Sequence, residues 1–591
     1  MTIEIARNEY PRPSFERETW MNLNGSWNFD FDDDNKGIAE EWFNKPEFNQ
    51  IITVPYTYQS KLSGINNQDF HDIVWYSREF DLTEDLKGKR IILNFGAVDY
   101  KADIWVNGVH LSTHEGGHIP FSVEISNVVQ ESSNLLVVRA EDYTKDLELP
   151  RGKQYWKRTS DGIFYTRTTG IWQTVWIEGV AEAYLSKVWL TPDLDAKKVL
   201  VEYEVNGASD NTKLGVTISL DNIIMVDDCV KVVNGRGKRD FWLDQETTID
   251  WNHQESWAWS PENPVLFDIN FEIYNNDIKV DSVKSYFGLR KVSIVEGRFM
   301  LNNRPYYQKM LLDQGYWEDS LLTAPTDEDF VKDIELCKSM GFNGVRKHQK
   351  IEDPRYLYWA DKLGFLVWGE MASAYTYSRK YVKRITDEWM TMIERDYNHP
   401  CIVAWTPLNE SWGVDCIMNN KDEQAHSAAM YYLTKSLDTT RPVISNDGWD
   451  HTKSDLLTIH DYEWRKDILK DRYSTMENIL SSKHSGRGMF AQGWHYEGQP
   501  VIVSEFGGIS YQKGNWKGWG YSSANSDDDY AKRYYDVVSA MLESPLVQGF
   551  VYTQVTDVEQ EINGLMTYDR KPKIDVEIIK AINEGKWKPN K

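Results

Sequence analysis

The sequence predicts a multidomain chain in which two all-β sandwiches precede a C-terminal (β/α)8 barrel, and three observations lead to this prediction. Residues 15–180 alternate apolar and polar side chains, with turn residues at short intervals. Residues 183–288 form a second β-rich stretch of roughly 100 residues, a length typical of an immunoglobulin-like sandwich. After residue 290, short apolar strands alternate with helical patterns. We therefore expect domains at 1–182, 183–289 and 290–591.

Length and composition exclude several classes of protein. With 591 residues, the chain is too long for one hydrophobic core. No apolar run is long enough to cross a bilayer, so we expect no contact with a membrane. A net charge of −25 argues against nucleic-acid binding, because phosphates are neutralised by Lys and Arg. The four cysteines lack metal-site spacing and the N-terminal residues lack the pattern of a secretion signal, which together favour the cytoplasm.

Local patterns place the strands of the two sandwiches. In the first domain, Ala102, Ile104 and Val106 face one way, and the Asn-Gly pair that follows favours a type I′ hairpin. Further strands are expected there at 90–95, 135–140 and 173–178, and in the second domain at 201–205, 215–220 and 266–273.

In the third domain, helix signals separate the strands. Thr326 and Asp329 resemble a capping box, and Gly341 closes the helix that they begin. Pro354 opens the next helix, which Gly364 ends. Eight strands are expected, at 308–312, 343–348, 365–370, 402–409, 442–446, 456–461, 501–505 and 547–553. This number of strands indicates a (β/α)8 barrel.

Two acidic residues end strands of this barrel. Glu410 follows the fourth strand, and Glu505 ends the seventh. The carboxyl ends of barrel strands form one face, so the two carboxylates are expected to meet there. Glycoside hydrolysis requires one carboxylic acid to protonate the departing oxygen and one carboxylate to meet the anomeric carbon, so the pair indicates that chemistry. The 25 Trp and 33 Tyr suit core packing as well as stacking on sugar faces.

Several short signatures are spread over the whole chain. They are Leu-Asn-Gly-Ser-Trp at 23–27, Ile-Trp-Val-Asn-Gly at 104–108, Thr-Gly-Ile-Trp-Gln at 169–173, Trp-Ser-Pro-Glu-Asn-Pro at 259–264, Gly-Phe-Asn-Gly-Val-Arg at 341–346, Asn-Glu at 409–410 and Ser-Glu-Phe-Gly at 504–507. Taken together they resemble glycoside hydrolase family 2, the β-galactosidase and β-glucuronidase family. This resemblance implies that the first domain is a jelly-roll sugar-binding-like domain, followed by the immunoglobulin-like domain and a catalytic TIM barrel.

The resemblance implies roles for the two carboxylates. Glu410 matches the general acid/base and Glu505 the nucleophile of a configuration-retaining double displacement, with the carboxyl groups about 5–5.5 Å apart. Two carboxylates at that distance repel each other, so we expect the pKa of the acid, Glu410, to be raised. Glu505 should stay ionised if hydrogen-bond donors surround it. Once the covalent intermediate has formed, the pKa of Glu410 should fall, and Glu410 can then act as a base toward water.

Neighbouring residues match substrate-binding positions of the family. Asn409 matches the residue that binds the sugar 2-hydroxyl, and Tyr462 resembles the tyrosine that donates to the nucleophile. Arg346 matches an arginine near the nucleophile, where a fixed cation would depress its pKa. His348 and His460 are further candidates; His348 lies in a segment one position shorter than in many relatives, so either a sugar contact or a structural role fits it.

Other matches concern the walls of the sugar site and a metal. Asp313 sits where family members bind distal hydroxyls, and Trp494 and Tyr552 are candidate stacking walls, although relatives more often have Trp at position 552. Glu370 resembles a magnesium ligand of the large β-galactosidases, which pair it with a His two positions later, where this chain has Ala372. We therefore expect neither a metal nor another cofactor.

A second motif bears on which terminal sugar the substrate carries. β-Glucuronidases carry Asn-x-Lys before a Thr-x-Asp-Arg-x-Pro-Lys stretch; this chain keeps the stretch at 567–573 but lacks that Lys. The prediction is therefore an exo-acting β-galactosidase acting on a carbohydrate. Lys517, in the loop after Glu505, keeps a β-glucuronidase open as the alternative. An inactive carbohydrate-binding protein is the alternative from another class, and the subunit number, a homo-oligomer included, stays open.

Overall fold

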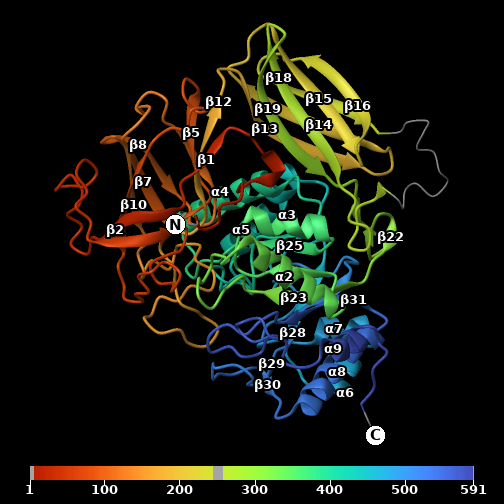
Figure 1. The fold of residues 1–591 in the computed structure, drawn as a ribbon. Helices are drawn as coiled ribbons and strands as arrows, with labels where there is room; N and C mark the ends of the chain where they lie inside the picture. Colours follow the sequence, from red (N-terminus) through yellow and green to blue (C-terminus); the bar gives the residue numbers. More distant parts are fainter. Residues whose placement is uncertain (1–4, 244–256, 590–591) are drawn as a thin grey trace.

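The computed structural model of the chain describes residues 5–243 and 257–589 (Figure 1). It contains two antiparallel β sandwiches and a parallel barrel, and the figure shows the sandwiches in red to yellow above the barrel in green to blue. The fold class predicted from the sequence is therefore confirmed.

The first sandwich contains two facing sheets around a common apolar core. The four-stranded sheet has the order β1 (Trp20–Asn22), β12 (Val175–Val180), β5 (Arg90–Phe95) and β9 (Phe121–Glu124). The six-stranded sheet has the order β3 (Gln50–Val54), β2 (Gly25–Phe31), β4 (Ile73–Phe80), β10 (Asn134–Glu141), β7 (Lys101–Val106) and β8 (Val109–Glu115).

The alternation in β7 directs its apolar side chains into this core. Ala102, Ile104 and Val106 are fully buried. Asn107 and Gly108 have φ of 52° and 77°, as a type I′ turn requires, and they join β7 to β8. The short strands β6 (Val98–Asp99) and β11 (Gly170–Ile171) pair separately.

The second sandwich contains three strands facing four. The order is β13 (Tyr184–Asp193), β14 (Lys198–Asn206), β17 (Arg236–Trp242) in one sheet, and β16 (Ile223–Lys231), β15 (Thr212–Leu220), β18 (Phe267–Asn275), β19 (Ile278–Phe287) in the other. The 3-10 turn η1 (Pro13–Phe15) packs against β19, and the small sheet β20 (Val292–Val295), β21 (Arg298–Leu301), β22 (Arg304–Pro305) precedes the barrel.

Seven parallel strands build the barrel sheet. Their order is β26 (Ile402–Thr406), β25 (Leu366–Glu370), β24 (Gly344–Lys347), β23 (Gln308–Asp313), β31 (Val547–Thr553), β28 (Val501–Gly507) and β27 (Leu457–Asp461). The strand predicted at 442–446 is instead an extended segment with isolated parallel bridges to β26 and the turn after it. Backbone hydrogen bonds join this segment to Trp405 of β26, but the two do not form a regular ladder.

Helices alternate with these strands and cover the barrel (Figure 1). They are α2 (Asp327–Ser339), α3 (Pro354–Leu363), α4 (Arg379–Asp396), α5 (Lys421–Leu437), α6 (Lys466–Arg472), α7 (Met476–Ser481), α8 (Asp527–Glu543) and α9 (Val576–Asn583), with β29 (Ile509–Ser510) and β30 (Ser522–Ser523) between β28 and α8. The capping box of Thr326 and Asp329 is present, and Gly364 has φ of 69° at the end of α3, as the sequence predicts.

The first sandwich contacts the mouth of the barrel. The backbone N–H groups of Arg151 and Gly152 both donate to the carbonyl of Ser373, at 3.1 and 3.0 Å. The Tyr165 hydroxyl donates to Glu561 at 2.6 Å. Loops of the first domain therefore form part of the surface around the strand ends.

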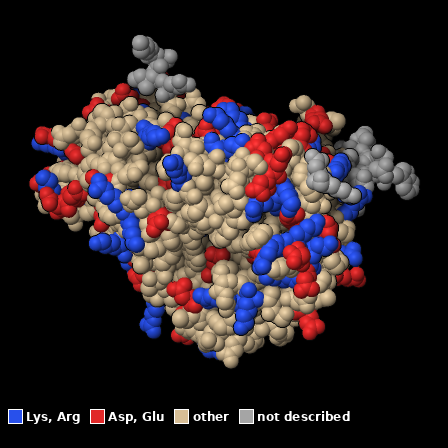
Figure 2. Space-filling model, turned by 90° about the horizontal axis from the view of Figure 1, so that it is seen from below, with Lys and Arg blue, Asp and Glu red and all other residues tan. Residues whose placement is uncertain are grey.

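None of the helices in the described residues is long and apolar enough to span a bilayer. Figure 2 shows the molecule from below, with acidic and basic side chains interspersed and a central hollow that has acidic atoms at its bottom.

Candidate active site

The turn after β26 presents Glu410 at the mouth of the barrel. Glu410 and Ser411 have φ of 51° and 61°, a left-handed conformation that is costly for residues with side chains. Two hydrogen bonds hold it: Glu410 N donates to the carbonyl of Asp447, and Ser411 N donates to Asn446 Oδ1, both at 2.9 Å. The extended segment at 442–447 thus fixes the position of the candidate acid/base.

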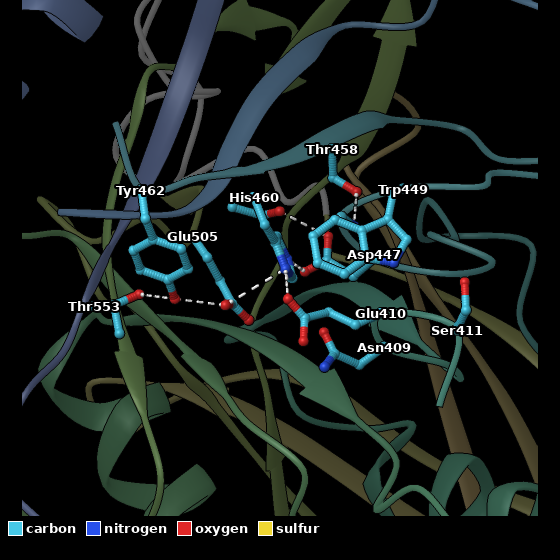
Figure 3. A network of polar contacts seen from close by, with 12 residues as sticks. Asn409, Glu410, Ser411, Asp447, Trp449, Thr458, His460, Tyr462, Glu505 and Thr553 are labelled. Carbon is cyan, nitrogen blue, oxygen red and sulfur yellow. Dashed lines mark hydrogen bonds and ion pairs between the residues drawn. The ribbon is translucent and has the colours of Figure 1, made fainter. Parts of the chain in front are cut away.

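Glu505 lies on β28 and faces Glu410 (Figure 3). A carboxylate oxygen of each residue and a ring nitrogen of His460 all lie within 4.8 Å of one another. Carboxyl groups of retaining glycosidases are about 5–5.5 Å apart, whereas those of inverting enzymes are about 6.5–9.5 Å apart. The upper bound of 4.8 Å between these oxygens is nearer to the separation in retaining enzymes than to that in inverting enzymes.

Arg346, from β24, connects most of the site and is fully buried. Its Nη1 lies 2.9 Å from Glu505 Oε1 and 2.6 Å from Asp447 Oδ2. Its Nε donates to Glu370 at 2.5 Å, and its Nη2 donates to Asn409 Oδ1 at 2.6 Å. One guanidinium thus compensates three buried carboxylates and orients the asparagine beside Glu410.

Tyr462 supplies the second donor to Glu505. Its hydroxyl donates to Glu505 Oε2 at 2.7 Å and lies 3.1 Å from Thr553 Oγ1 (Figure 3). Its ring stacks on Tyr521 with centroids 3.4 Å apart. Glu505 therefore has a hydrogen-bond donor on each oxygen.

Asn409 and His348 lie beside this pair. Asn409 Nδ2 is buried and, among the described residues, has no hydrogen-bond partner, so it can donate to a sugar hydroxyl. His348 Nδ1 lies 3.0 Å from Glu370 Oε1 and 3.1 Å from Arg346 Nη2. Burial, then the charges of Lys153 and Arg346, lower the pKa of His348 well below its usual range, so its ring is neutral.

The expected rise in the pKa of Glu410 is wrong. Burial alone would raise the pKa of Glu410, but the hydrogen bond and charge of His460 lower it below the usual value. Burial would lower the pKa of His460, but Glu505 and Asp447 raise it to about 10. These two directions favour the imidazole of His460 over Glu410 as the holder of the proton that they share.

Among the described residues, four of the predicted ones form no hydrogen bond or ion pair with Glu410, Glu505 or Arg346. Both oxygens of Asp313 have partners, Lys347 Nζ at 2.5 Å and Gly315 N at 2.8 Å. Lys517 is exposed, and Trp494 is half-buried against the barrel core. Tyr552 is fully buried between Phe506 and Tyr534, so it offers no face to a sugar.

Several residues in the site were not predicted. Asp447 accepts from His460 Nε2 at 2.8 Å and from Ser504 Oγ at 2.9 Å, and Trp449 packs against the His460 ring. The polar run Ser-Asn-Asp-Gly at 445–448, directly after apolar residues, is the signal that could have identified Asp447. Lys153 comes from the first domain, and its Nζ lies 4.8 Å from the centre of the Trp412 ring.

Two groups of side chains in the described residues are close enough to share a metal ion, and we assign neither as a metal site. Asp361, His399 and Cys401 are buried together, and Asp361 accepts from Tyr286 and from Cys401 N. The other group is Glu410, His460 and Glu505, where a ring N–H accounts for the short contacts.

Comparison with protein families covers nearly the whole chain. The sugar binding domain of the glycosyl hydrolases family 2 matches residues 20–166, a second family 2 domain matches 183–290, and the family 2 TIM barrel domain matches 292–585.

Curated proteins that are similar to this chain include β-glucuronidases. That of Sus scrofa is 27% identical over 562 residues, and that of Homo sapiens is 27% identical over 555; each alignment covers 84% of this chain and 79% of the relative.

Solved structures share the fold over their whole length. A β-glucuronidase of an uncultured Clostridium sp. has a TM-score of 0.77 at 22% identity, covering 98% of this chain and 99% of that one. The β-glucuronidase of Ruminococcus gnavus in complex with D-glucuronic acid has 0.78 at 20%, covering 97% and 99%. A β-galacturonidase of Eisenbergiella tayi bound to glycerol has 0.74 at 20%, covering 98% of each chain.

Proposed function

Because the chain belongs to glycosyl hydrolase family 2, we propose that it is an exo-acting, configuration-retaining β-glycosidase. The observation that carries the mechanism is the distance of no more than 4.8 Å between an oxygen of Glu410 and an oxygen of Glu505. This separation leaves no room for the water that an inverting enzyme places between its carboxyl groups.

Glu505 attacks the anomeric carbon, and Glu410 protonates the departing oxygen. Arg346 and Tyr462 orient Glu505 by one hydrogen bond to each of its oxygens. Asn409 Nδ2 binds the 2-hydroxyl, a contact that strengthens in the transition state. Glu410 then activates water, which hydrolyses the glycosyl ester of Glu505.

Loops of the first domain close one side of the site, which suits attack at a chain end. Phe164 makes ring contacts with Tyr375 and Trp412, which lie on two barrel loops. Trp156 extends the same aromatic group, which therefore forms a wall beside Glu410. A site with such a wall admits a terminal sugar and its aglycone better than the middle of a polymer.

We propose a β-glucuronide as the substrate, in place of the β-galactoside expected from the sequence. Relatives that match over most of this chain include β-glucuronidases, and the first domain contributes one cation, Lys153, beside Trp412. In the described residues the Lys153 ammonium has no hydrogen bond and no ion pair, although Lys153 is only 7% exposed. A buried, unpaired ammonium favours an anionic ligand.

One observation supports a neutral sugar as the second candidate. Upstream of the 567–573 stretch, Asn563 donates to Glu561 at 3.0 Å, and the residues at 563–565 are Asn-Gly-Leu, without the Lys of the Asn-x-Lys pattern. Glu561 is 2% exposed, and burial raises its pKa, while Lys153 and Tyr165 oppose that rise. A carboxyl group at this position suits a sugar hydroxyl better than a sugar carboxylate.

A panel of 4-nitrophenyl β-glycosides tests these proposals. We expect the glucuronide to be hydrolysed, with the galacturonide and galactoside weaker, and Glu505→Ala to remove all activity. Faster hydrolysis of the galactoside would select the neutral-sugar candidate. No hydrolysis of any glycoside by the folded wild-type protein would contradict the enzymatic proposal itself.

A further inference from the structure

His460, at the end of β27, lies between three carboxylates (Figure 3). Its Nδ1 is 2.7 Å from Glu410 Oε1 and 3.4 Å from Glu505 Oε2. Its Nε2 is 2.8 Å from Asp447 Oδ2. The residue is 2% exposed, so water does not separate these groups.

The partners of the ring determine where its protons lie. Asp447 accepts from Ser504 Oγ and pairs with Arg346, so it is ionised, and its short contact with Nε2 requires an N–H on that nitrogen. The 2.7 Å distance between His460 Nδ1 and Glu410 Oε1 is that of a hydrogen bond, which requires one more proton, bonded either to the nitrogen or to the oxygen. The structure therefore contains one proton that His460 and Glu410 share.

The charges around the ring place this proton on His460 when no substrate is bound. Burial lowers the pKa of His460, but Glu505 and Asp447 raise it to about 10, while Glu410 itself has a lowered pKa. The positive charge of Arg346, whose Nη1 lies 3.3 Å from His460 Nε2, disfavours a positive charge on the imidazole. The charge of His460 also acts on the imidazoles of His348, His451 and His484, and burial lowers the pKa of each of the three.

The ring is also held in place by close packing. A Cβ at Gly448, where φ is 101°, would lie 2.7 Å from His460 Nδ1, so only glycine fits beside the imidazole. Trp449 lies edge-on at 5.5 Å between ring centroids. The orientation that faces Nδ1 toward Glu410 is therefore fixed before substrate binds.

We propose that His460, oriented by Asp447, stores the proton that Glu410 delivers to the departing oxygen. This inference rests on the proposed glycosidase activity and adds a positioning residue to it. The proton moves from Nδ1 to Glu410, and from Glu410 to the glycosidic oxygen as the C–O bond breaks and Glu505 bonds to the anomeric carbon. His460 is then neutral and keeps its N–H to Asp447. During hydrolysis of the ester, Glu410 takes a proton from water and returns it to Nδ1.

The covalent step itself favours this transfer. Among the charges that raise the pKa of His460, that of Glu505 has the largest effect. Glu505 loses this charge when it forms the glycosyl ester. The imidazole therefore holds its proton less strongly at the stage where Glu410 must give one up.

His460→Gln tests the proposal with two leaving groups on the sugar that the wild-type enzyme hydrolyses. A dinitrophenyl glycoside needs no protonation of its leaving group, whereas a phenyl glycoside does. We expect kcat/KM to fall about 10²–10⁴-fold for the phenyl glycoside and less than about 10-fold for the dinitrophenyl glycoside. The basic limb of the pH profile should move to lower pH, because Glu410 must then hold the proton alone. His451→Gln, which removes a nearby imidazole whose Nε2 lies 2.8 Å from the carbonyl oxygen of Thr458, should leave the ratio of the two substrates unchanged.

Equal losses for both substrates, with an unchanged pH profile, would show a purely structural role and overturn the proposal. A second measurement does not depend on activity. In protein labelled with 15N-histidine, the signal that His460→Gln removes should stay protonated up to about pH 10, and a midpoint near the ordinary value of about 6.5 would also overturn the proposal. If the wild type hydrolyses no glycoside while this signal behaves as expected, the proposed function fails and the proton assignment stands.

Discussion

The guanidinium of Arg346, on β24, donates a hydrogen bond of 2.9 Å to Glu505, on β28. The same side chain also binds Glu370, Asp447 and Asn409, and it is fully buried. A planar fork of five N–H donors suits this arrangement, and an ammonium does not.

Arg346→Lys is therefore expected to be a severe change. The ammonium cannot reach Glu505 and Asn409 together with the other two carboxylates, so at least two hydrogen bonds to charged groups are lost. At about 1.5 kcal/mol each or more, we expect kcat/KM to fall at least about 100-fold. Steady-state kinetics check this, with Arg465→Lys, an exposed arginine paired with Glu463, as the control that keeps full activity.

Rescue by azide separates the roles of the two carboxylates. In Glu505→Ala, azide enters the space of the nucleophile and attacks from its side, so we expect the glycosyl azide with inverted configuration. In Glu410→Ala, azide replaces water after the ester has formed, so we expect retained configuration. NMR of the products distinguishes the two anomers. The opposite pattern would reverse the assignment.

A buried acid at the domain interface predicts how stability depends on pH. Glu388, on α4, accepts from His118 N at 3.1 Å and is 1% exposed. Burial raises its pKa from 4.5 to about 8, and the hydrogen bond from His118 opposes this only in part. The folded state thus binds the proton more strongly than the unfolded chain does. This tighter binding adds to the free energy of unfolding; the contribution is complete below pH 4.5 and is lost as the pH rises through about 8.

Glu388→Gln removes this dependence, because the amide is neutral at every pH. We expect the variant to be more stable than the wild type at pH 9, by about 1–3 kcal/mol, and to differ little at pH 5. Thermal and urea unfolding at the two pH values measure this. Asp387→Asn, an exposed carboxylate on the same helix that pairs with Lys383, is the matched control and should show no such change. A stability difference independent of pH would contradict the prediction.

The sequence predicted the elements well where the signal is local. The alternation of Ala102, Ile104 and Val106 and the cap at Thr326 depend on neighbours within a few residues, and both lie where expected. The segment at 442–446 reads as a strand because it is apolar, but pairing requires a partner on each side, and here only isolated bridges form.

Site residues that belong to a short sequence motif were predicted, whereas those that only tertiary contacts bring to the site were missed. Barrel strands are buried on both faces, so their pattern does not tell which residues face the centre. Tyr552 was expected to wall the sugar, but it faces α8, and its neighbour Thr553 contacts Tyr462 instead. Lys153 reaches the site only because its loop docks on Ser373 through backbone hydrogen bonds, which no local pattern encodes.

Lys153 also gives the sharpest test of the substrate. Its charge lowers the pKa of Glu410 and opposes the rise in the pKa of Glu561, and its ammonium lies 4.8 Å from the centre of the Trp412 ring. If it binds the carboxylate of a glucuronide, Lys153→Met should raise KM and lower kcat/KM for that glycoside about 10–100-fold, the value of a hydrogen bond to a charged group. The galactoside should change far less.

The control for Lys153→Met is Lys157→Met, which removes an exposed ammonium from the same loop and should change neither substrate. The alternative role for Lys153 is to tune Glu410 by its charge alone. In that case both glycosides would lose activity by the same factor, and the pH profile would shift for both. A selective loss for the glucuronide is therefore the outcome that assigns Lys153 to the substrate, because only that glycoside carries the matching charge.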